Sequence, residues 1–255
     1  IAKEVFEARC DKLWQAAKRM MPTITIPSKK RWAMPHAYAF PKDKDPINKT
    51  RPIVPYYHHP CKRLLFWAGR AFLFILKTSQ ENSIIDAFTI FNTREFVPKA
   101  TAATMPREAT PFLGDVKNMY TNMPHNGEKG LKATVNWVLD LATKHLDMKK
   151  LIIPTHKNTP HKPFFGAIRK SSKNRLHMPT EMIRSILMFD IKNIYFTLGN
   201  GTLQQTEGVP MGSPASPALA VALCMKAEHT WLSTLSHGDR KGVLGFRYMD
   251  DLLVF

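Results

Sequence analysis

The chain has 255 residues, 44% of them hydrophobic, which is enough for one large core or two closely packed subdomains. Lysine and arginine number 37 against 20 acidic residues, giving a formal net charge of +17. Such an excess favours a polyanionic partner, because cations that neutralise phosphates release counterions; the alternative is a basic surface without a specialised role. The longest apolar run is too short to span a bilayer, and the three cysteines lack the spacing of a zinc site or disulfide framework. The sequence therefore argues against a membrane protein and favours a reducing compartment.

Helices and strands alternate in the first part of the chain. Apolar spacing predicts an amphipathic helix over residues 2–21, two strands around 38–41 and 50–55, and a buried helix over 60–78. A basic loop joins the two strands, and Lys42, Lys44, Lys49 and Arg51 would cluster near it. Two interpretations of this loop stay open: a clamp for phosphates, in which Arg51 offers a planar fork of donors, or a solvated charged hairpin.

A second informative stretch begins near residue 111. Within residues 111–124, an apolar strand carries Asp115 near its end and then bends into a turn with Tyr120 five residues later. Alone, an aspartate at a strand end is usually a turn or cap residue. A helix is expected over residues 127–147. Residues 155–177, within a basic insertion at about 151–178, are rich in Lys, Arg, His and Pro and predict a loop or ribbon that either contacts nucleic acid or is simply solvated.

The remaining elements lead to a glycine- and proline-rich segment. A helix over residues 179–190, capped by Thr180, and a hairpin over 194–206 precede the segment 208–217, which opens a further apolar helix over 218–231. Gly208 and Gly212 permit close approach of the backbone to a ligand. The small residues that follow keep the helix N-terminus open to an anion or a flat base.

The chain ends in two adjacent carboxylates, Asp250 and Asp251, between two short apolar runs. This pattern predicts a tight β-hairpin with both aspartates at its turn. Two anions beside an apolar hairpin are unfavourable unless a cation neutralises them. Oxygen ligands favour Mg²⁺ or Mn²⁺, and Asp115 is the candidate further ligand. Because the sequence begins at Ile1 and stops inside an expected strand, we expect it to be part of a longer polypeptide.

Taken together and in order, these stretches resemble the reverse transcriptase family. Asp115 with Tyr120 matches the first palm motif, residues 208–217 the second, and residues 248–251 (Tyr-Met-Asp-Asp) the third. Residues 42–51 resemble the fingers motif that holds the incoming triphosphate. Within the family, the residues of these motifs look closest to those of Penelope-like elements, which are relatives of telomerase. Group II intron and non-LTR retrotransposon enzymes share much of the pattern.

The resemblance implies an α/β (α+β) right-hand polymerase fold. The fingers, with the N-terminal helix, would occupy residues 1–110. A partial palm over residues 111–255 would have an antiparallel sheet flanked by helices. The thumb and any endonuclease would lie outside this sequence, and neither the compartment nor the oligomeric state follows from it.

The implied activity is RNA-directed DNA synthesis on an RNA template and a DNA primer. The primer 3′-hydroxyl would attack the α-phosphate of a dNTP, and pyrophosphate would leave. Two Mg²⁺ (or Mn²⁺) ions held by Asp115 and Asp250 would activate the hydroxyl and stabilise the leaving oxygens. Asp251 would be an accessory ligand or a primer-side carboxylate. Lys42 and Arg51 would neutralise the triphosphate.

Three further residues complete the implied nucleotide site. The ring of Tyr120 would exclude a ribose 2′-hydroxyl, so that the enzyme takes dNTPs. Met211, followed by Gly212, holds a place where many reverse transcriptases have Gln, and it keeps apolar contact without the amide hydrogen bonds. The alternatives are an RNA-dependent RNA polymerase and an inactive nucleic-acid-binding remnant of a mobile element.

Overall fold

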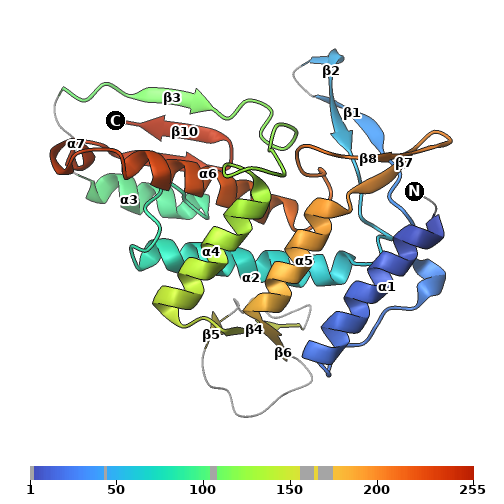
Figure 1. The fold of residues 1–255 in the computed structure, drawn as a ribbon. Helices are drawn as coiled ribbons and strands as arrows, with labels where there is room; N and C mark the ends of the chain where they lie inside the picture. The colour runs from blue at the N-terminus through green and yellow to red at the C-terminus, as the bar shows by residue number, and fades with distance from the viewer. Residues whose placement is uncertain (1–2, 43–44, 104–107, 156–163, 166–174) are drawn as a thin grey trace.

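The computed structural model describes residues 3–42, 45–103, 108–155, 164–165 and 175–255 (Figure 1). The chain has a mixed α/β fold in which small antiparallel sheets surround a layer of crossing helices. Figure 1 shows the long helix α2 running through the molecule, with α4 and α5 crossing it and α6 beside it. This arrangement confirms the expected mixture of helices and antiparallel sheets.

The described part of the chain has five long helices, α1, α2, α4, α5 and α6. None of the helices in the described part of the chain is long and apolar enough to cross a bilayer. Shorter turns of helix connect the larger elements. In chain order the helices are α1 (Lys3–Met20), α2 (Lys62–Glu81), α3 (Phe96–Ala102), α4 (Leu131–Leu146), α5 (Thr180–Lys192), α6 (Ser216–Leu232) and α7 (His237–Lys241), with 3₁₀ turns at Lys29–Arg31 and Thr93–Glu95.

Helix α2 is the centre of the core, because apolar side chains occupy most of its circumference. Leu64, Phe72 and Ile75 are fully buried, and each such burial contributes about 1.5–3 kcal/mol. Gly69 lies so close to the backbone of Pro214 that a side chain there would collide with it. One continuous cluster of buried side chains runs from α1 to α6 and holds the sheets in place.

Among the residues that the structure describes, four antiparallel sheets lie around this core. The sheet that carries the aspartates has the order β3-β10-β9, and Figure 1 shows it beside α6. Its strands are β3 (Phe112–Asp115), β9 (Gly245–Tyr248) and β10 (Asp251–Val254). The others are the hairpin of β1 (Tyr38–Lys42) and β2 (Asp45–Ile53), the hairpin of β7 (Tyr195–Leu198) and β8 (Gly201–Gln204), and the sheet of β4 (Lys150–Pro154), β5 (Phe164–Phe165) and β6 (Arg175–Pro179).

Several local expectations need correction. The segment over residues 155–177, expected as a basic loop or ribbon, contains β5 and the start of β6, which pair with β4, so the described part is not a plain loop; residues 156–163 and 166–174 lie outside the described residues. Thr180 does not cap α5, since its hydroxyl donates to the carbonyl of Met148 and the N-cap is Pro179. Helices α3 and α7 were not expected, because both are short and lack an apolar stripe. The division of the chain at residue 110 stays a prediction.

Candidate active site

Two aspartates face each other across adjacent strands of the β3-β10-β9 sheet. The antiparallel register pairs Asp251 of β10 directly with Asp115 at the end of β3. Residues directly opposite in such a ladder project from the same face of a sheet. The backbone of Asp250 continues the pairing, since its carbonyl accepts a 2.9 Å hydrogen bond from the amide of Val116. All three aspartates, which come from distant parts of the sequence, therefore meet at one end of this sheet, and all are exposed.

The hairpin turn between β9 and β10 has only two residues, Met249 and Asp250. Met249 has φ of +56°, a left-handed conformation that is uncommon for a residue with a side chain. Asp251 was expected to share the turn, but it is the first residue of β10 and pairs with Tyr248. Alternation along a strand consequently does not determine where Asp250 points, because it precedes the strand.

A buried arginine, Arg247, holds this turn by a hydrogen bond to its main chain. Arg247 of β9 is 1% exposed, and its Nη1 donates a 2.9 Å hydrogen bond to the carbonyl of Met249. Its guanidinium also pairs with the carboxylate of Glu228 on α6 and donates to the hydroxyl of Thr89. The backbone of Arg247 bonds to Phe88 and Ile90, so the hairpin is held by main chain and side chain together.

Tyr120 lies beside the aspartates and joins two motifs. The Tyr120 ring is partly buried, and this burial, together with the negative charge of Asp250, raises the pKa of its hydroxyl. The carbonyl of Tyr120 accepts a 2.7 Å hydrogen bond from the amide of Val209. Gly208, at φ +73°, packs against the same backbone, where a side chain would collide with it. The first and second motifs are thus in direct contact.

The second motif is also tied to the end of β2. The amide of Val54 donates a 3.0 Å hydrogen bond to the carbonyl of Met211. Gly212, at φ +140°, lies against the carbonyl of Val54, and any side chain at this position would clash with it. This glycine is therefore required by both its conformation and the close approach of the two backbones.

Beneath the second motif lies a buried carboxyl group that connects three segments. Asp190, at the end of α5, accepts hydrogen bonds from Ser213 Oγ at 2.9 Å and from the hydroxyl of Tyr56 at 3.3 Å. Burial raises the pKa of Asp190 to about 7, although both hydrogen bonds oppose that shift. The same burial, with the nearby Asp190 charge, raises the pKa of Tyr56 well above its ordinary value.

The two cations expected to hold the triphosphate lie on the β1–β2 hairpin, which Figure 1 shows apart from the sheet that carries the aspartates. Lys42 ends β1 and Arg51 is an exposed residue of β2, paired with Phe40. Among the described residues, no hydrogen bond or ion pair joins either cation to the three aspartates. The neighbours of Arg51, Thr50 and Pro52, help line a cavity of about 330 Å³ that also includes Met211. Side chains alternate along a strand, so Arg51 projects from the other face of β2.

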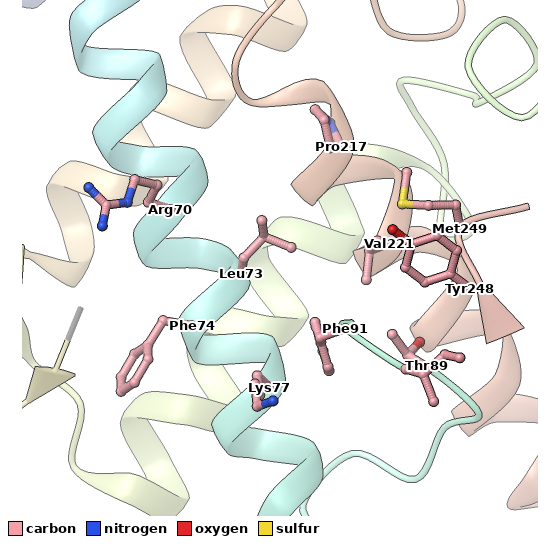
Figure 2. A pocket seen from close by; sticks show the side chains of 11 residues that line it. Arg70, Leu73, Phe74, Lys77, Thr89, Phe91, Pro217, Val221, Tyr248 and Met249 are labelled. Carbon is pink, nitrogen blue, oxygen red and sulfur yellow. The ribbon is translucent and has the colours of Figure 1, made fainter. Parts of the chain in front are cut away.

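A second cavity, of about 350 Å³, lies beside the hairpin turn (Figure 2). Figure 2 shows Tyr248 and Met249 next to Val221 of α6, across from side chains of α2. The lining is mostly apolar, and its Lys77 pairs with Glu95. None of the three aspartates lines this cavity, so it is distinct from the carboxylate cluster.

The carboxylate cluster fits the chemistry of magnesium only in part. In the described residues, no three His, Cys, Asp or Glu side chains form a ready-made metal cage. Mg²⁺ is commonly held by one or two carboxylates together with substrate phosphates and water, rather than by an all-protein site. Asp115 paired opposite Asp251, with Asp250 beside them, supplies carboxylates of that kind.

The buried residues that support the site, Arg247 and Asp190, were not among the expected site residues. Arg247 is a charged residue inside an apolar strand, which is a signal of a partner in the core. Asp190 continues the apolar stripe of Ile183, Ile186 and Leu187 on α5, so its position predicts burial. In both cases the sequence pattern indicates burial, but it does not indicate which residue is the hydrogen-bond or ion-pair partner.

Comparison with known proteins places the fold. No protein-family model matches the chain, and no curated protein matches it either. Among solved structures, apo telomerase from Candida tropicalis has a TM-score of 0.60 at 12% identity, covering 100% of this chain and 43% of that one. Telomerase from Candida albicans in complex with a TWJ fragment of telomeric RNA has a TM-score of 0.61 at 14% identity, covering 99% of this chain and 42% of that one. The corresponding Candida tropicalis complex gives 0.62 at 11% identity, covering 98% and 39%. The chain therefore has the fold of a part of telomerase, a reverse transcriptase, and spans less than half the length of those proteins.

Proposed function

We propose that this chain is the fingers and palm of an RNA-directed DNA polymerase. One observation carries the proposal: Asp115 and Asp251 pair directly across adjacent strands, and Asp250 lies at the turn beside them. These are the aspartates on which the motif resemblance depends. The fold shared with telomerase supports the same conclusion independently of the motifs.

The reaction would be phosphoryl transfer from a dNTP to a primer 3′-hydroxyl. We assign Asp115 and Asp250 as the residues that hold Mg²⁺ or Mn²⁺, with Asp251 as an accessory carboxylate. Two such ions, when bound, would activate the hydroxyl and stabilise the leaving oxygens. Tyr120 would limit the space at the sugar, since its ring is half-buried close to Asp250.

The chain's cations would supply the electrostatic part of the mechanism. Arg51 and Lys42, on the β1–β2 hairpin, would neutralise the triphosphate once the substrate spans the distance to the aspartates. Met211 and Gly212 lie on the segment bonded to Val54 at the end of that hairpin, so they would form the floor of the nucleotide site. The net charge of +17 favours binding of template and primer through their phosphates.

We further propose that the chain comes from a retroelement of the Penelope-like group. The residues of its motifs support this proposal. The fold that the chain shares with telomerase supports it too, because Penelope-like elements are related to telomerase. An RNA template and a DNA primer would be its partners. Two of the similar telomerase structures were solved with a fragment of telomeric RNA, which is consistent with an RNA partner.

The test is primer extension on an RNA template, with the full polypeptide that carries this chain. Incorporation of dNTPs and of rNTPs in Mg²⁺ is compared for the unaltered protein, for Asp250→Ala, and for Asp140→Ala as a matched control. Asp140 is an exposed aspartate on α4, paired with Arg184, and its loss should cost at most about 1 kcal/mol.

We expect incorporation of dNTPs that disappears in Asp250→Ala and persists in Asp140→Ala. Template–primer binding should survive in both variants, because the basic surface provides that affinity. A preference for rNTPs would instead indicate an RNA-dependent RNA polymerase. Tight binding without any incorporation would indicate an inactive nucleic-acid-binding remnant.

A further inference from the structure

The peptide groups on both sides of Asp250 are hydrogen-bonded. In the peptide before it, the carbonyl of Met249 accepts a 2.9 Å hydrogen bond from Arg247 Nη1. In the peptide after it, the carbonyl of Asp250 accepts a 2.9 Å hydrogen bond from the amide of Val116. Because peptide groups are planar, fixing both of them fixes the direction of the Cα–Cβ bond between them. These two hydrogen bonds therefore determine where the Asp250 side chain starts.

The hydrogen bond from Arg247 restrains the part of the turn that most needs it. Met249 has φ of +56°, and such a conformation persists in a residue with a side chain only where the surroundings hold it. Packing does not fill the space on one side of the turn, since Tyr248 and Met249 line the cavity of about 350 Å³ in Figure 2. The Arg247 side chain supplies a restraint that packing on that side does not.

The guanidinium of Arg247 is held at all three nitrogens. Its Nε pairs with Glu228, and its Nη2 donates to the hydroxyl of Thr89 and, at 3.4 Å, to the second carboxylate oxygen of Glu228. Nη1 donates to the carbonyl of Met249. A planar fork makes these contacts together, whereas a lysine has one nitrogen on a flexible stem. The arrangement therefore requires the shape of arginine as well as its charge.

The partners of this guanidinium are anchored to the core. Glu228 on α6 also accepts a 3.1 Å hydrogen bond from the amide of Phe88. The carbonyl of Thr89 accepts a 2.9 Å hydrogen bond from Gln80 Nε2 on α2. The restraint on the turn thus extends back to two core helices, α2 and α6, and does not depend on the hairpin alone.

Stability alone gives a weak reason for a charged residue that is 1% exposed. A buried ion pair loses its hydration, and an apolar pair of similar size is often equally stable. An apolar side chain, however, cannot donate to the Met249 carbonyl. We propose that Arg247 is a positioning residue that fixes Asp250 through the main chain of Met249 and so raises the affinity of the carboxylate cluster for Mg²⁺ or Mn²⁺. This role rests on the function proposed above.

Two variants remove the restraint in different ways. Arg247→Met/Glu228→Gln removes the donor without leaving a buried charge unpaired, and its glutamine keeps an oxygen for the Phe88 amide. Arg247→Lys keeps the positive charge beside Glu228 but loses the fork. The matched control is Arg184→Met/Asp140→Asn, which removes one positive and one negative charge from a more exposed pair. Urea unfolding verifies that each variant is folded.

Hydrogen exchange at the amide of Val116 reports on Asp250 directly, because this amide donates to the Asp250 carbonyl. We expect exchange there to become at least about tenfold faster in Arg247→Met/Glu228→Gln and in Arg247→Lys, while amides within α5 exchange at their original rates. The control should exchange as the unaltered protein does. Unchanged exchange at Val116 in either folded Arg247 variant would overturn the positioning role.

Titration with Mn²⁺, followed by electron paramagnetic resonance, measures metal affinity without requiring synthesis. The relevant binding is the part that Asp250→Ala removes. We expect both Arg247 variants to bind Mn²⁺ about 10–100-fold more weakly, the usual effect of losing a residue that orients metal ligands. The control should keep its affinity. Full affinity in Arg247→Lys would show that charge matters and the fork does not, and would overturn the proposal.

Primer extension separates a failure of this role from a failure of the proposed polymerase. Suppose that the unaltered protein extends primers and that Arg247→Met/Glu228→Gln does so with the same Mn²⁺ requirement. The positioning role would then be overturned and the polymerase would stand. If the unaltered protein extends no primer, while exchange at Val116 and Mn²⁺ binding change as expected, the polymerase is overturned and the positioning role is supported.

Discussion

Ser213 of the second motif donates a 2.9 Å hydrogen bond to Asp190 at the end of α5, and the other oxygen of that carboxyl accepts from Tyr56. The carboxyl is fully buried, and burial raises its pKa to about 7 from an ordinary value of 3.8. A single titratable group therefore connects the second motif, α5 and the segment that follows β2.

This pKa predicts a pH-dependent stability. As pH rises through about 4, the unfolded chain releases the Asp190 proton while the folded chain keeps it until about pH 7. Asp190 should thus reduce the free energy of unfolding progressively between pH 4 and pH 7, by up to a few kcal/mol. Urea unfolding at several pH values measures this, and Asp190→Asn should remove that part of the dependence. An identical pH profile in the variant would contradict the prediction.

The buried pair of Arg247 and Glu228 predicts an asymmetric mutational effect. Arg247→Met should lower the free energy of unfolding by about 3–5 kcal/mol, because it leaves Glu228 largely buried without a charged partner. The double variant Arg247→Met/Glu228→Leu should recover much of the loss. Arg184→Met, which breaks a more exposed pair with Asp140, is the control and should cost about 1 kcal/mol. Equal losses of stability in the single and double variants, measured by denaturant unfolding, would count against the pair.

Tyr120 predicts the sugar selectivity. Replacing its half-buried ring by Ala should open space at the sugar and reduce the preference for dNTPs over rNTPs at least about tenfold. Tyr120→Phe keeps the ring and should keep the preference. The measurement is kcat/KM for a matched dNTP and rNTP in primer extension. Unchanged selectivity in Tyr120→Ala would disprove this role.

A small substitution at Gly212 should lower the free energy of unfolding considerably. Gly212→Ala should lower the free energy of unfolding by about 1–3 kcal/mol or more, since its φ of +140° is strained for alanine and the new methyl group meets the Val54 carbonyl. Gly201→Ala, at the start of β8, is the control: a methyl group there meets only ordinary van der Waals contact and should change stability by at most about 0.5 kcal/mol. Similar small effects at both positions would show that β2 and the second motif separate easily.

The strands that carry the aspartates could be predicted because their signal is local. Short apolar runs on both sides of Asp250 and Asp251 indicate a hairpin, and β9 and β10 lie where this pattern predicts them. The register could not be predicted in this way. The pairing of Asp115 with Asp251 depends on how β3 meets β10 across the sheet, which no local pattern encodes.

The interactions beneath the site depend on distant partners and so escaped prediction. Arg247 pairs with Glu228 on α6 and donates a hydrogen bond to Thr89 on a loop. Asp190 accepts hydrogen bonds from Ser213 and Tyr56. Each group is stable in the core only through those partners. The sequence indicated the aspartates exposed at the sheet end but not the buried polar residues that hold their surroundings.

The connection between β2 and the second motif consists of main-chain atoms. The amide of Val54 bonds to the carbonyl of Met211, and Gly212 lies against the Val54 carbonyl. Apart from the glycine, these contacts do not depend on which side chains are present, so the hydrogen bond between residues 54 and 211 does not itself require valine or methionine there. A joint of this kind survives extensive sequence divergence, which is one physical reason why a fold can persist between proteins that are only 11–14% identical.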